Sequence, residues 1–328
     1  MKTRRELLIA LGAGVLITAL PALAQKPRLW RIGILALRSR PSSPGDAYDA
    51  FAQGMSDMGY VEGKDYVFDW VYADGNYDRL AGLAAELVQR KVDVIVTTSA
   101  VGAQAAQRTT RTIPIVSAVT VDPVRDGLAA SLAHPGGNVT GLSPSVIDVS
   151  PKLLELMVTA VPKLSRVGVL VNPTSTTHAS LRDALQSAAL KLDLKLRPVE
   201  ARSPEDFEPG FGALKREGVQ ALIVLPDALF FLHRQRLVDQ AARSRLPSVY
   251  YNQEYVEAGG LMSYGENLAE FYRRSAALVD KILKGAKPAD LPFAQPTRFF
   301  LVINRKTANA IGVSIPQELL LRADKVIE

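Results

Sequence analysis

The sequence predicts an α/β protein of two doubly wound parallel-sheet lobes joined by three crossover strands. Short apolar runs, typical of strands buried on both faces, alternate with stretches of helical periodicity along the whole chain. This alternation restarts near the middle, where similar runs recur in the same order about 130 positions later. The length of 328 residues exceeds one ordinary domain and suits two domains of about 150 residues each.

Residues 1–24 are predicted to be a signal peptide that is removed during export. Three positive charges precede an apolar stretch at 7–20, and Ala22 and Ala24 supply the small side chains that a signal peptidase accepts. The apolar stretch is shorter than the roughly 20 residues of a membrane-spanning helix, which favours a cleaved signal peptide. A retained membrane anchor is the alternative. The pair Arg4-Arg5 allows either the Sec or the twin-arginine route.

The first half of the mature chain is expected to hold four strands and four helices. The strands are expected at 31–37, 66–72, 92–96 and 113–119, where apolar runs have strand length. The helices are expected at 46–58, at 77–90, from Ser99 onward and at 124–132. The second of these helices carries leucines at helical spacing, which give it one apolar face.

The second half repeats this plan. Residues 166–170, 219–224 and 246–249 repeat, in this order, the patterns of residues 31–35, 92–96 and 112–115. Because helix-linked strands form parallel sheets with right-handed crossovers, two copies of one βαβ plan predict two such sheets. A strand at 259–265 and a long helix at 268–284 are left over, and that helix must pack on one of the two lobes.

Three passages of the chain between the lobes complete the predicted architecture. They are expected near 138–143, 260–265 and 291–297. The N-terminal lobe then consists of residues 25–141 plus 263–294, and the C-terminal lobe of residues 142–262 plus 295–328. Three parallel crossovers permit the two lobes to close on a ligand like a clamshell.

Composition excludes several classes of site. The chain has no cysteine, which removes disulfides, thiolate nucleophiles and cysteine-based metal sites. Its three histidines, His134, His178 and His233, lie far apart without a partner at helical ligand spacing, so neither a metal site nor a cofactor is predicted. The formal net charge is +6, but the basic residues are scattered along the chain, so nucleic-acid binding is not expected.

Candidate binding residues follow the predicted strands, because ligands of open parallel sheets lie beyond the carboxyl ends of the strands. Thr98 and Ser99 follow one strand and begin a small-residue helix, where hydroxyls and free amides suit a carboxylate. Asp122 follows the next strand and could pair with an amine. For Ser99 and Asp122 the alternative role is that of a cap on the following segment.

Further candidates come from the second lobe. They are Asn172, Asp227, Tyr250 and Asn252 at strand ends, and Tyr264 at a crossover. Such amide and aromatic groups fit a pocket with apolar walls and a few orienting polar groups. Since neighbouring residues on a strand point to opposite faces, only one of Tyr250 and Tyr251 can face the cleft.

No catalytic motif is present in the sequence, so the chain is predicted not to be an enzyme. It lacks a Gly-x-Ser-x-Gly elbow, a Walker loop and a metal-ligand helix. A hydrolase is the less favoured alternative, and it would need a serine and a histidine placed together in the cleft.

Six segments resemble a known family. They are residues 54–64, 73–80, 134–141, 259–265, 282–292 and 295–304. These motifs resemble those of ABC-transporter substrate-binding proteins of the tryptophan/tyrosine-binding type, and the resemblance extends from Trp30 to Glu328. It implies a type I periplasmic-binding fold that delivers a small organic ligand, an amino acid or an aromatic or carboxylic acid, to an ABC permease in the inner membrane.

The resemblance also implies where the ligand lies and where the protein acts. It places the ligand carboxylate near Thr98 and Ser99 and the other polar end near Asp122. A signal peptide without a lipidation cysteine implies a free periplasmic protein, which we expect to be a monomer. A periplasmic sensor subunit of the same fold is the alternative function.

Overall fold

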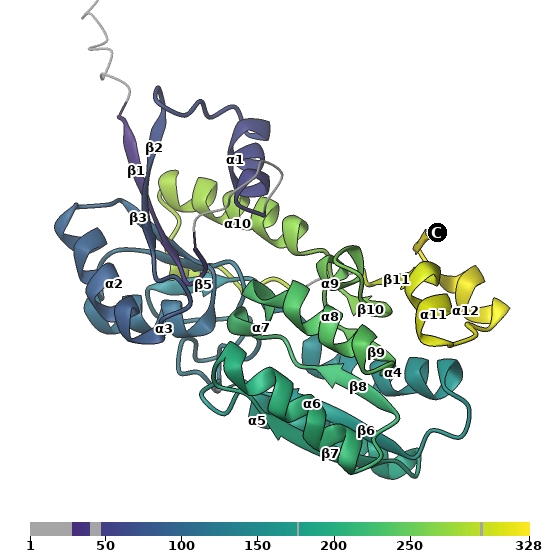
Figure 1. The fold of residues 1–328 in the computed structure, drawn as a ribbon. Coiled ribbons are helices and arrows are strands. Elements are labelled where there is room, and N and C mark those ends of the chain that lie inside the picture. The colour runs from purple at the N-terminus through teal and green to yellow at the C-terminus, as the bar shows by residue number, and fades with distance from the viewer. Residues whose placement is uncertain (1–27, 40–46, 176, 296–297) are drawn as a thin grey trace, which may run out of the picture.

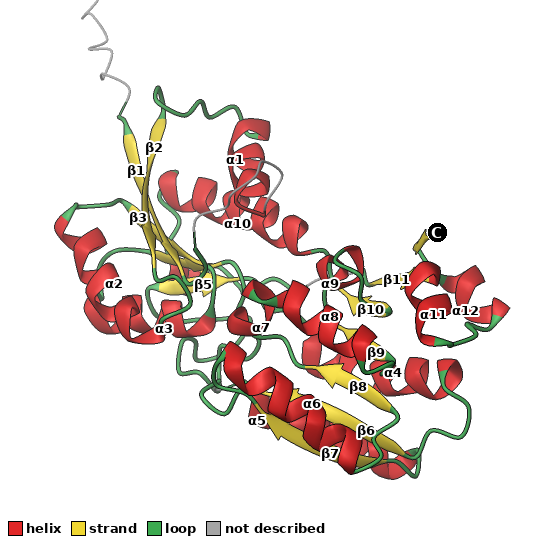
Figure 2. Ribbon diagram, viewed as in Figure 1, coloured by secondary structure: helices red, strands yellow, loops and turns green. Residues whose placement is uncertain are grey.

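Two sheets organise the computed structural model, which describes residues 28–39, 47–175, 177–295 and 298–328. Each sheet is the centre of one α/β lobe and carries helices on both faces (Figures 1 and 2). The predicted fold class is therefore confirmed. The predicted signal peptide lies outside the described residues.

The N-terminal lobe contains a five-stranded parallel sheet of order β2-β1-β3-β4-β5. Its strands are β1 (Trp30–Ala36), β2 (Tyr66–Tyr72), β3 (Val94–Thr97), β4 (Ile115–Ser117) and β5 (Val139–Gly141). Its early helices are α1 (Ala47–Asp57), η1 (Tyr77–Arg79), α2 (Leu80–Gln89) and α3 (Ala100–Thr109). Alternate residues of β1 enter different cores, with Ile34 packed on the α1 face and Leu35 on the face of α2 and α3.

The C-terminal lobe contains a seven-stranded sheet of order β12-β11-β10-β9-β8-β6-β7. Its strands are β6 (Arg166–Val171), β7 (Lys195–Glu200), β8 (Ala221–Val224), β9 (Ser248–Tyr250), β10 (Met262–Gly265), β11 (Phe300–Asn304) and β12 (Lys325–Ile327). Its helices are α4 (Val146–Ala160), α5 (His178–Lys191), η2 (Pro204–Asp206), α6 (Phe207–Arg216), α7 (Ala228–Leu232), α8 (Arg234–Arg243), α9 (Gln253–Glu257), α11 (Arg305–Ile311) and α12 (Gln317–Arg322). Only the β10–β11 pair in this sheet is antiparallel.

The predicted internal repeat is confirmed by the strand order. The series β7-β6-β8-β9-β10 repeats the series β2-β1-β3-β4-β5 element by element. Even the packing of one glycine recurs: a Cβ on Gly33 would meet Leu87 at 3.1 Å, and a Cβ on Gly168 would meet Leu214 at 2.7 Å. The two lobes are therefore two copies of one packing scheme.

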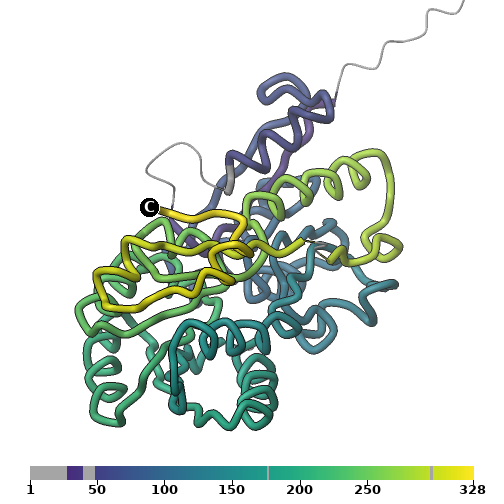
Figure 3. Tube along the Cα trace, turned by 90° about the vertical axis from the view of Figure 1, so that its right-hand side faces the viewer, coloured from purple at the N-terminus to yellow at the C-terminus, as the bar shows by residue number. Residues whose placement is uncertain are grey.

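Each lobe contains one helix that directly follows a strand of the other lobe. α4 follows β5 of the N-terminal lobe but packs in the C-terminal core, beside α5. α10 (Leu268–Leu283) follows β10 of the C-terminal lobe but packs on α1 of the N-terminal lobe. In Figure 3 the late, yellow-green α10 accordingly lies with the early, blue part of the chain. The leftover helix thus packs on the N-terminal lobe.

The chain passes between the lobes after β5, after β10 and between η3 (Pro288–Asp290) and β11. The first and third passages run side by side, because Ala294 N donates to the Gly141 carbonyl at 3.0 Å and Ser143 N donates to the Ala294 carbonyl at 2.9 Å. The predicted lobe boundary at residue 263 falls inside β10, which pairs within the C-terminal sheet over Met262–Gly265.

One predicted helix is wrong. Residues 124–132 form turns, in which the N–H groups of Leu128 and Ala129 both donate to the Pro123 carbonyl. Gly127 adopts a φ of 70°, a left-handed conformation that interrupts a right-handed helix. The apolar residues of this segment pack on the lobe from a turn.

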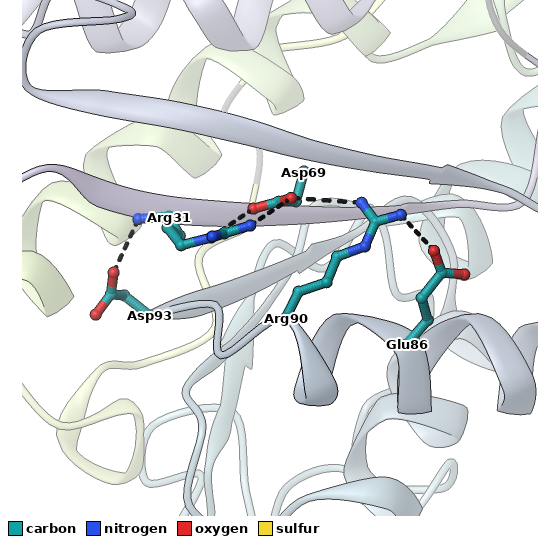
Figure 4. Close-up of polar contacts among 5 residues, drawn as sticks. All are labelled: Arg31, Asp69, Glu86, Arg90 and Asp93. Carbon is teal, nitrogen blue, oxygen red and sulfur yellow. Dashed lines mark hydrogen bonds and ion pairs between the residues drawn. The ribbon is translucent and has the colours of Figure 1, made fainter.

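An ion-pair network holds together the end of the N-terminal sheet where β1 begins (Figure 4). The Arg31 guanidinium donates two hydrogen bonds to Asp69 of β2, at 2.9 and 3.0 Å, and Asp93 accepts from Arg31 N at 2.8 Å. Arg90, just after α2, contacts both Asp69 and Glu86. The network therefore joins β1, β2 and the end of α2 near the start of β1, away from the carboxyl end of that strand.

Candidate functional site

A cavity of about 170 Å³ lies between the two lobes, beyond the carboxyl ends of the parallel strands. The N-terminal lobe and α10 contribute Leu37, Arg38, Tyr77, Thr98, Ser99, Ala100, Val101, Val119, Val121, Leu268, Phe271 and Tyr272. The C-terminal lobe and the crossovers contribute Pro144, Val146, Ser175, Thr177, Pro226, Asp227, Ala228, Phe231, Tyr251, Asn252 and Glu266. Apolar and aromatic walls with a few polar groups are typical of a small-molecule site.

The N-terminal side of the cavity is built around the start of α3. Ser99 caps this helix, since its Oγ accepts from Gly102 N at 3.2 Å. Thr98 Oγ1 accepts from Leu37 N at 3.1 Å. Both hydroxyl oxygens are thus used as acceptors, which leaves both O–H groups available as donors. The first-turn N–H groups of Ala100 and Val101 lie outside the intrahelical bonding pattern, at the positive end of the helix dipole.

The C-terminal side of the cavity carries Asp227 and Asn252. Asp227 caps α7, with Oδ1 accepting from Leu229 N at 2.8 Å and from Phe230 N at 3.4 Å. Its Oδ2 accepts from Asn172 Nδ2 at 3.2 Å and, across the cleft, from the Tyr77 hydroxyl at 3.4 Å. By contrast, Asn252 precedes α9 without a capping hydrogen bond, so its amide is available to the cavity.

His178 lies between two strand ends of the C-terminal lobe and contacts the backbone of both. Its Nδ1 accepts from Asn172 N at 2.8 Å, and its Nε2 lies 3.1 Å from the Pro226 carbonyl oxygen. This pattern requires a neutral ring with the proton on Nε2. Burial lowers the pKa of His178, and the Asp227 carboxylate offsets part of that effect. The ring therefore ties the ends of β6 and β8 together.

Aromatic side chains form much of the remaining wall. Phe231 carries the Arg38 guanidinium 4.8 Å from its ring centre and the Arg234 guanidinium 4.9 Å from it. Arg38 belongs to the N-terminal lobe, so this cation–π contact spans the cleft. Tyr251 also lines the cavity, and its hydroxyl lies 3.0 Å from Ser150 Oγ.

Glu266 lies on the second crossover, between β10 and α10. Its Oε1 accepts from Ser145 N, on the first crossover, at 2.8 Å. Among the other described residues, none donates a hydrogen bond to its second oxygen, Oε2. Burial raises the pKa of Glu266, whereas the hydrogen bond from Ser145 acts in the opposite direction.

The structure brings four of the eight predicted site residues to the cavity, namely Thr98, Ser99, Asp227 and Asn252. Asn172 is buried beneath them and reaches the cavity only through Asp227. The other three do not line the cavity.

Each of those three has a partner elsewhere. Asp122 Oδ1 accepts from Arg125 N at 3.0 Å, the capping role weighed above as the alternative. Tyr250 is fully buried in the C-terminal core, stacked on Tyr255, because the strand turns it away from the cleft and turns Tyr251 toward it. Tyr264 stacks on Phe299.

Sequence reasoning missed several lining residues. Arg38, Ser175 and Glu266 follow strands, so the rule that selected Thr98 also applies to them. Phe271 and Tyr272 gave no such signal, because α10 reaches the cavity only by crossing to the other lobe. In the described part of the chain, no group of acidic residues and histidines is placed to hold a metal ion. None of the helices described is long and apolar enough to cross a membrane.

Comparisons with known proteins agree with a ligand-binding site between two lobes. Residues 31–327 match the family model of the ABC transporter substrate binding protein. The tyrosine-binding protein of Clostridioides difficile strain R20291 is 28% identical over 283 residues, which is 86% of this chain and 81% of that protein.

Two solved structures are similar as well. An ABC domain from Streptococcus pneumoniae in complex with L-Trp has a TM-score of 0.83 at 25% identity, over 92% of this chain and 100% of its own. The ligand-free, open form of a substrate binding protein with adhesive properties from Clostridium difficile has a TM-score of 0.66 at 26% identity, over 91% of this chain and 99% of its own. The chain belongs to the family of ABC transporter substrate-binding proteins.

Proposed function

We propose that this solute-binding protein holds an organic carboxylate of the amino-acid class in the cavity between its lobes. The observation that carries the proposal is the start of α3. Two hydroxyl donors, Thr98 and Ser99, meet two first-turn N–H groups there, at the edge of an otherwise apolar and aromatic cavity. A carboxylate satisfies these donors and interacts favourably with the helix dipole.

The ligands of the relatives support this class. The C. difficile relative is a tyrosine-binding protein, and the S. pneumoniae structure holds L-Trp. The aromatic wall of Phe231, Tyr251, Phe271 and Tyr272 suits a ligand with an aromatic or large apolar side chain. L-Tryptophan and L-tyrosine are therefore the first compounds to test.

Titration calorimetry and thermal shift with a panel of amino acids and aromatic acids test the proposal. A ligand at 100 times its Kd stabilises the native state by about 2.7 kcal/mol, which gives a clear rise in Tm. Thr98→Val should weaken carboxylate binding by about 10- to 100-fold, because it removes a donor to a charged acceptor.

A matched control separates binding from stability. Thr110→Val removes a similar hydroxyl at the far end of α3, where Thr110 Oγ1 accepts from Ile113 N at 3.2 Å, away from the cavity. It should lower the Tm of the free protein but leave the Kd unchanged. Equal Kd values for Thr98→Val and wild type, or no binding of any carboxylate, would count against the site.

We also propose that the ligand is bound without being altered. The hydrolase alternative needs a histidine beside a serine, yet no histidine is among the described residues that line the cavity. Both ring nitrogens of His178 already have partners. Chromatography after prolonged incubation should recover the ligand unchanged.

The biological setting is proposed from the family and from the sequence. We propose that the protein is exported with its signal peptide removed after Ala24 and acts as a monomer in the periplasm. There it passes its ligand to an ABC permease of the inner membrane.

A further inference from the structure

We propose that Glu266 accepts the ammonium group of the ligand, so that the cavity selects zwitterionic α-amino acids over simple carboxylic acids. This inference rests on the proposed function, since it adds a second polar contact to a ligand held by its carboxylate at α3. It also moves the amine subsite away from Asp122, which lies outside the cavity.

Asp227 and Glu266 are the acidic residues among the described lining of the cavity. Asp227 already accepts from four donors, two at each carboxylate oxygen. Four is about the number of acceptor sites on an ionised carboxylate, so Asp227 has little capacity left for a ligand. Its role is to cap α7 and to contact Tyr77 across the cleft.

Glu266 has the capacity that Asp227 lacks. One oxygen accepts from Ser145 N, and no other described residue donates to the second oxygen; besides Ser145, only the backbone N–H of Glu266 itself interacts with the carboxylate. A carboxylate removed from water without a counter-charge is unfavourable, and a bound ammonium would supply that charge. Burial raises the pKa of the Glu266 carboxyl, and a cation beside the carboxylate would lower it again.

The described residues around Glu266 offer no competing cation. Its carboxylate interacts with Tyr251, a neutral side chain whose hydroxyl is engaged with Ser150. The cationic lining residue, Arg38, is placed over the Phe231 ring. A ligand ammonium is therefore the cation that would best complement the Glu266 carboxylate.

The position of Glu266 also links the ligand to the hinge. Its bond to Ser145 N joins the second crossover to the first, and the first is bonded to the third through Ala294. An ammonium held by Glu266 would therefore contact the segments about which the lobes rotate. Glutamine in place of Glu266 keeps an acceptor for Ser145 N and removes only the charge.

The experiment measures Kd by calorimetry for three ligands of one shape: L-tryptophan, N-acetyl-L-tryptophan and 3-(indol-3-yl)propanoate, with the matching tyrosine series. Wild type should bind the free amino acid about 10- to 100-fold more tightly than either analogue, as for a lost charge-assisted hydrogen bond. Glu266→Gln should lose about the same factor for the amino acid and change little for the propanoate.

Glu270→Gln is the matched control, because it removes an exposed carboxylate on the same segment, in the first turn of α10. It should leave every Kd unchanged. Equal weakening of amino acid and propanoate by Glu266→Gln would overturn the proposal, since it would indicate a structural role.

The wild-type ligand series keeps the test decisive even if Glu266→Gln does not fold. Equal binding of all three ligands by wild type would overturn the ammonium subsite and leave the carboxylate site standing. Binding of none of them, nor of any other carboxylate, would overturn the proposed function itself together with this inference.

Discussion

At the scale of single residues, His178 makes the stability of the folded protein depend on pH. Its ring accepts one backbone hydrogen bond at Nδ1 and is placed to donate one at Nε2, so a second proton on Nδ1 would face the Asn172 N–H group. Burial holds the folded pKa of His178 below its ordinary value of 6.5. At acid pH the unfolded chain therefore binds a proton that the folded chain does not.

The expected result is a loss of stability on acidification. The contribution of His178 is fully present above about pH 6.5 and is lost as pH falls below that value, by up to about 1.4 kcal/mol per pH unit. His178→Gln should lower the Tm at pH 7.5 but reduce the fall in Tm between pH 7.5 and pH 5.5. His134→Gln, at an exposed loop histidine, should retain the wild-type slope. Identical slopes for wild type and His178→Gln would contradict this role.

The residue scale also shows what sequence reasoning could reach in the site. Strand ends identified Thr98, Ser99, Asp227 and Asn252, because parallel topology alone places such positions at a cleft. Topology does not say on which side of the chain a strand end presents its side chain. The choice between Tyr250 and Tyr251 depended on strand register, which the sequence does not contain.

At the scale of elements, the close contact of α1 with α10 depends on Gly54. A Cβ at this position would lie 2.6 Å from the Arg273 carbonyl oxygen and 2.9 Å from Ala276 Cβ. Neither neighbour is the flexible end of a long side chain, so the helices would have to separate. Gly82, in α2, is exposed, and a Cβ there would have no described atom within 4 Å.

Replacing each of these two helical glycines by alanine should change the stability of the protein in opposite directions. Gly54→Ala should destabilise the protein by about 1–3 kcal/mol, the usual cost of overpacking. Gly82→Ala should stabilise it by about 0.5–1 kcal/mol, because alanine is the better helix former. Denaturant unfolding followed by circular dichroism measures both. A stabilising Gly54→Ala would show that α1 and α10 are not held at this distance.

Elements were easier to predict than their partners. Strands and most helices follow from local periodicity, and the internal repeat follows from comparing such segments. The helix expected at 124–132 failed because apolar residues at suitable spacing also occur in a turn that packs on a core. Amphipathicity shows that a face of α10 is buried but not against which lobe. The assignment of residues 263–294 to the N-terminal lobe came from the expected order of the three crossovers.

At the scale of the whole molecule, several contacts across the cleft join the two lobes. They include the hydrogen bond from Tyr77 to Asp227, the stacking of Arg38 on Phe231 and a contact between Arg125 and Ser180. Burial, together with the nearby Asp227 carboxylate, raises the pKa of Tyr77, so its hydroxyl stays protonated and able to donate.

Removing one of these contacts should favour the open form. Tyr77→Phe should raise the Kd for L-tryptophan or L-tyrosine by about 3- to 10-fold, the value of one hydrogen bond. It should also increase the radius of gyration of the ligand-free protein in solution scattering. Tyr60→Phe is the control, because the Tyr60 hydroxyl bonds to Asp280 at 2.9 Å entirely within the N-terminal lobe. Equal effects of the two variants would exclude a specific role for Tyr77 in closure.

The exchange of helices between the lobes has a consequence for biosynthesis. Because α10 ends at Leu283, the N-terminal lobe, which is translated first, lacks the helix that packs on its α1 face until most of the C-terminal lobe has been made. Any shorter chain lacks the helix that covers this apolar face, so the N-terminal lobe cannot complete its core before α10 has been made. The part of the protein that is synthesised first therefore depends on one of the last helices for its core.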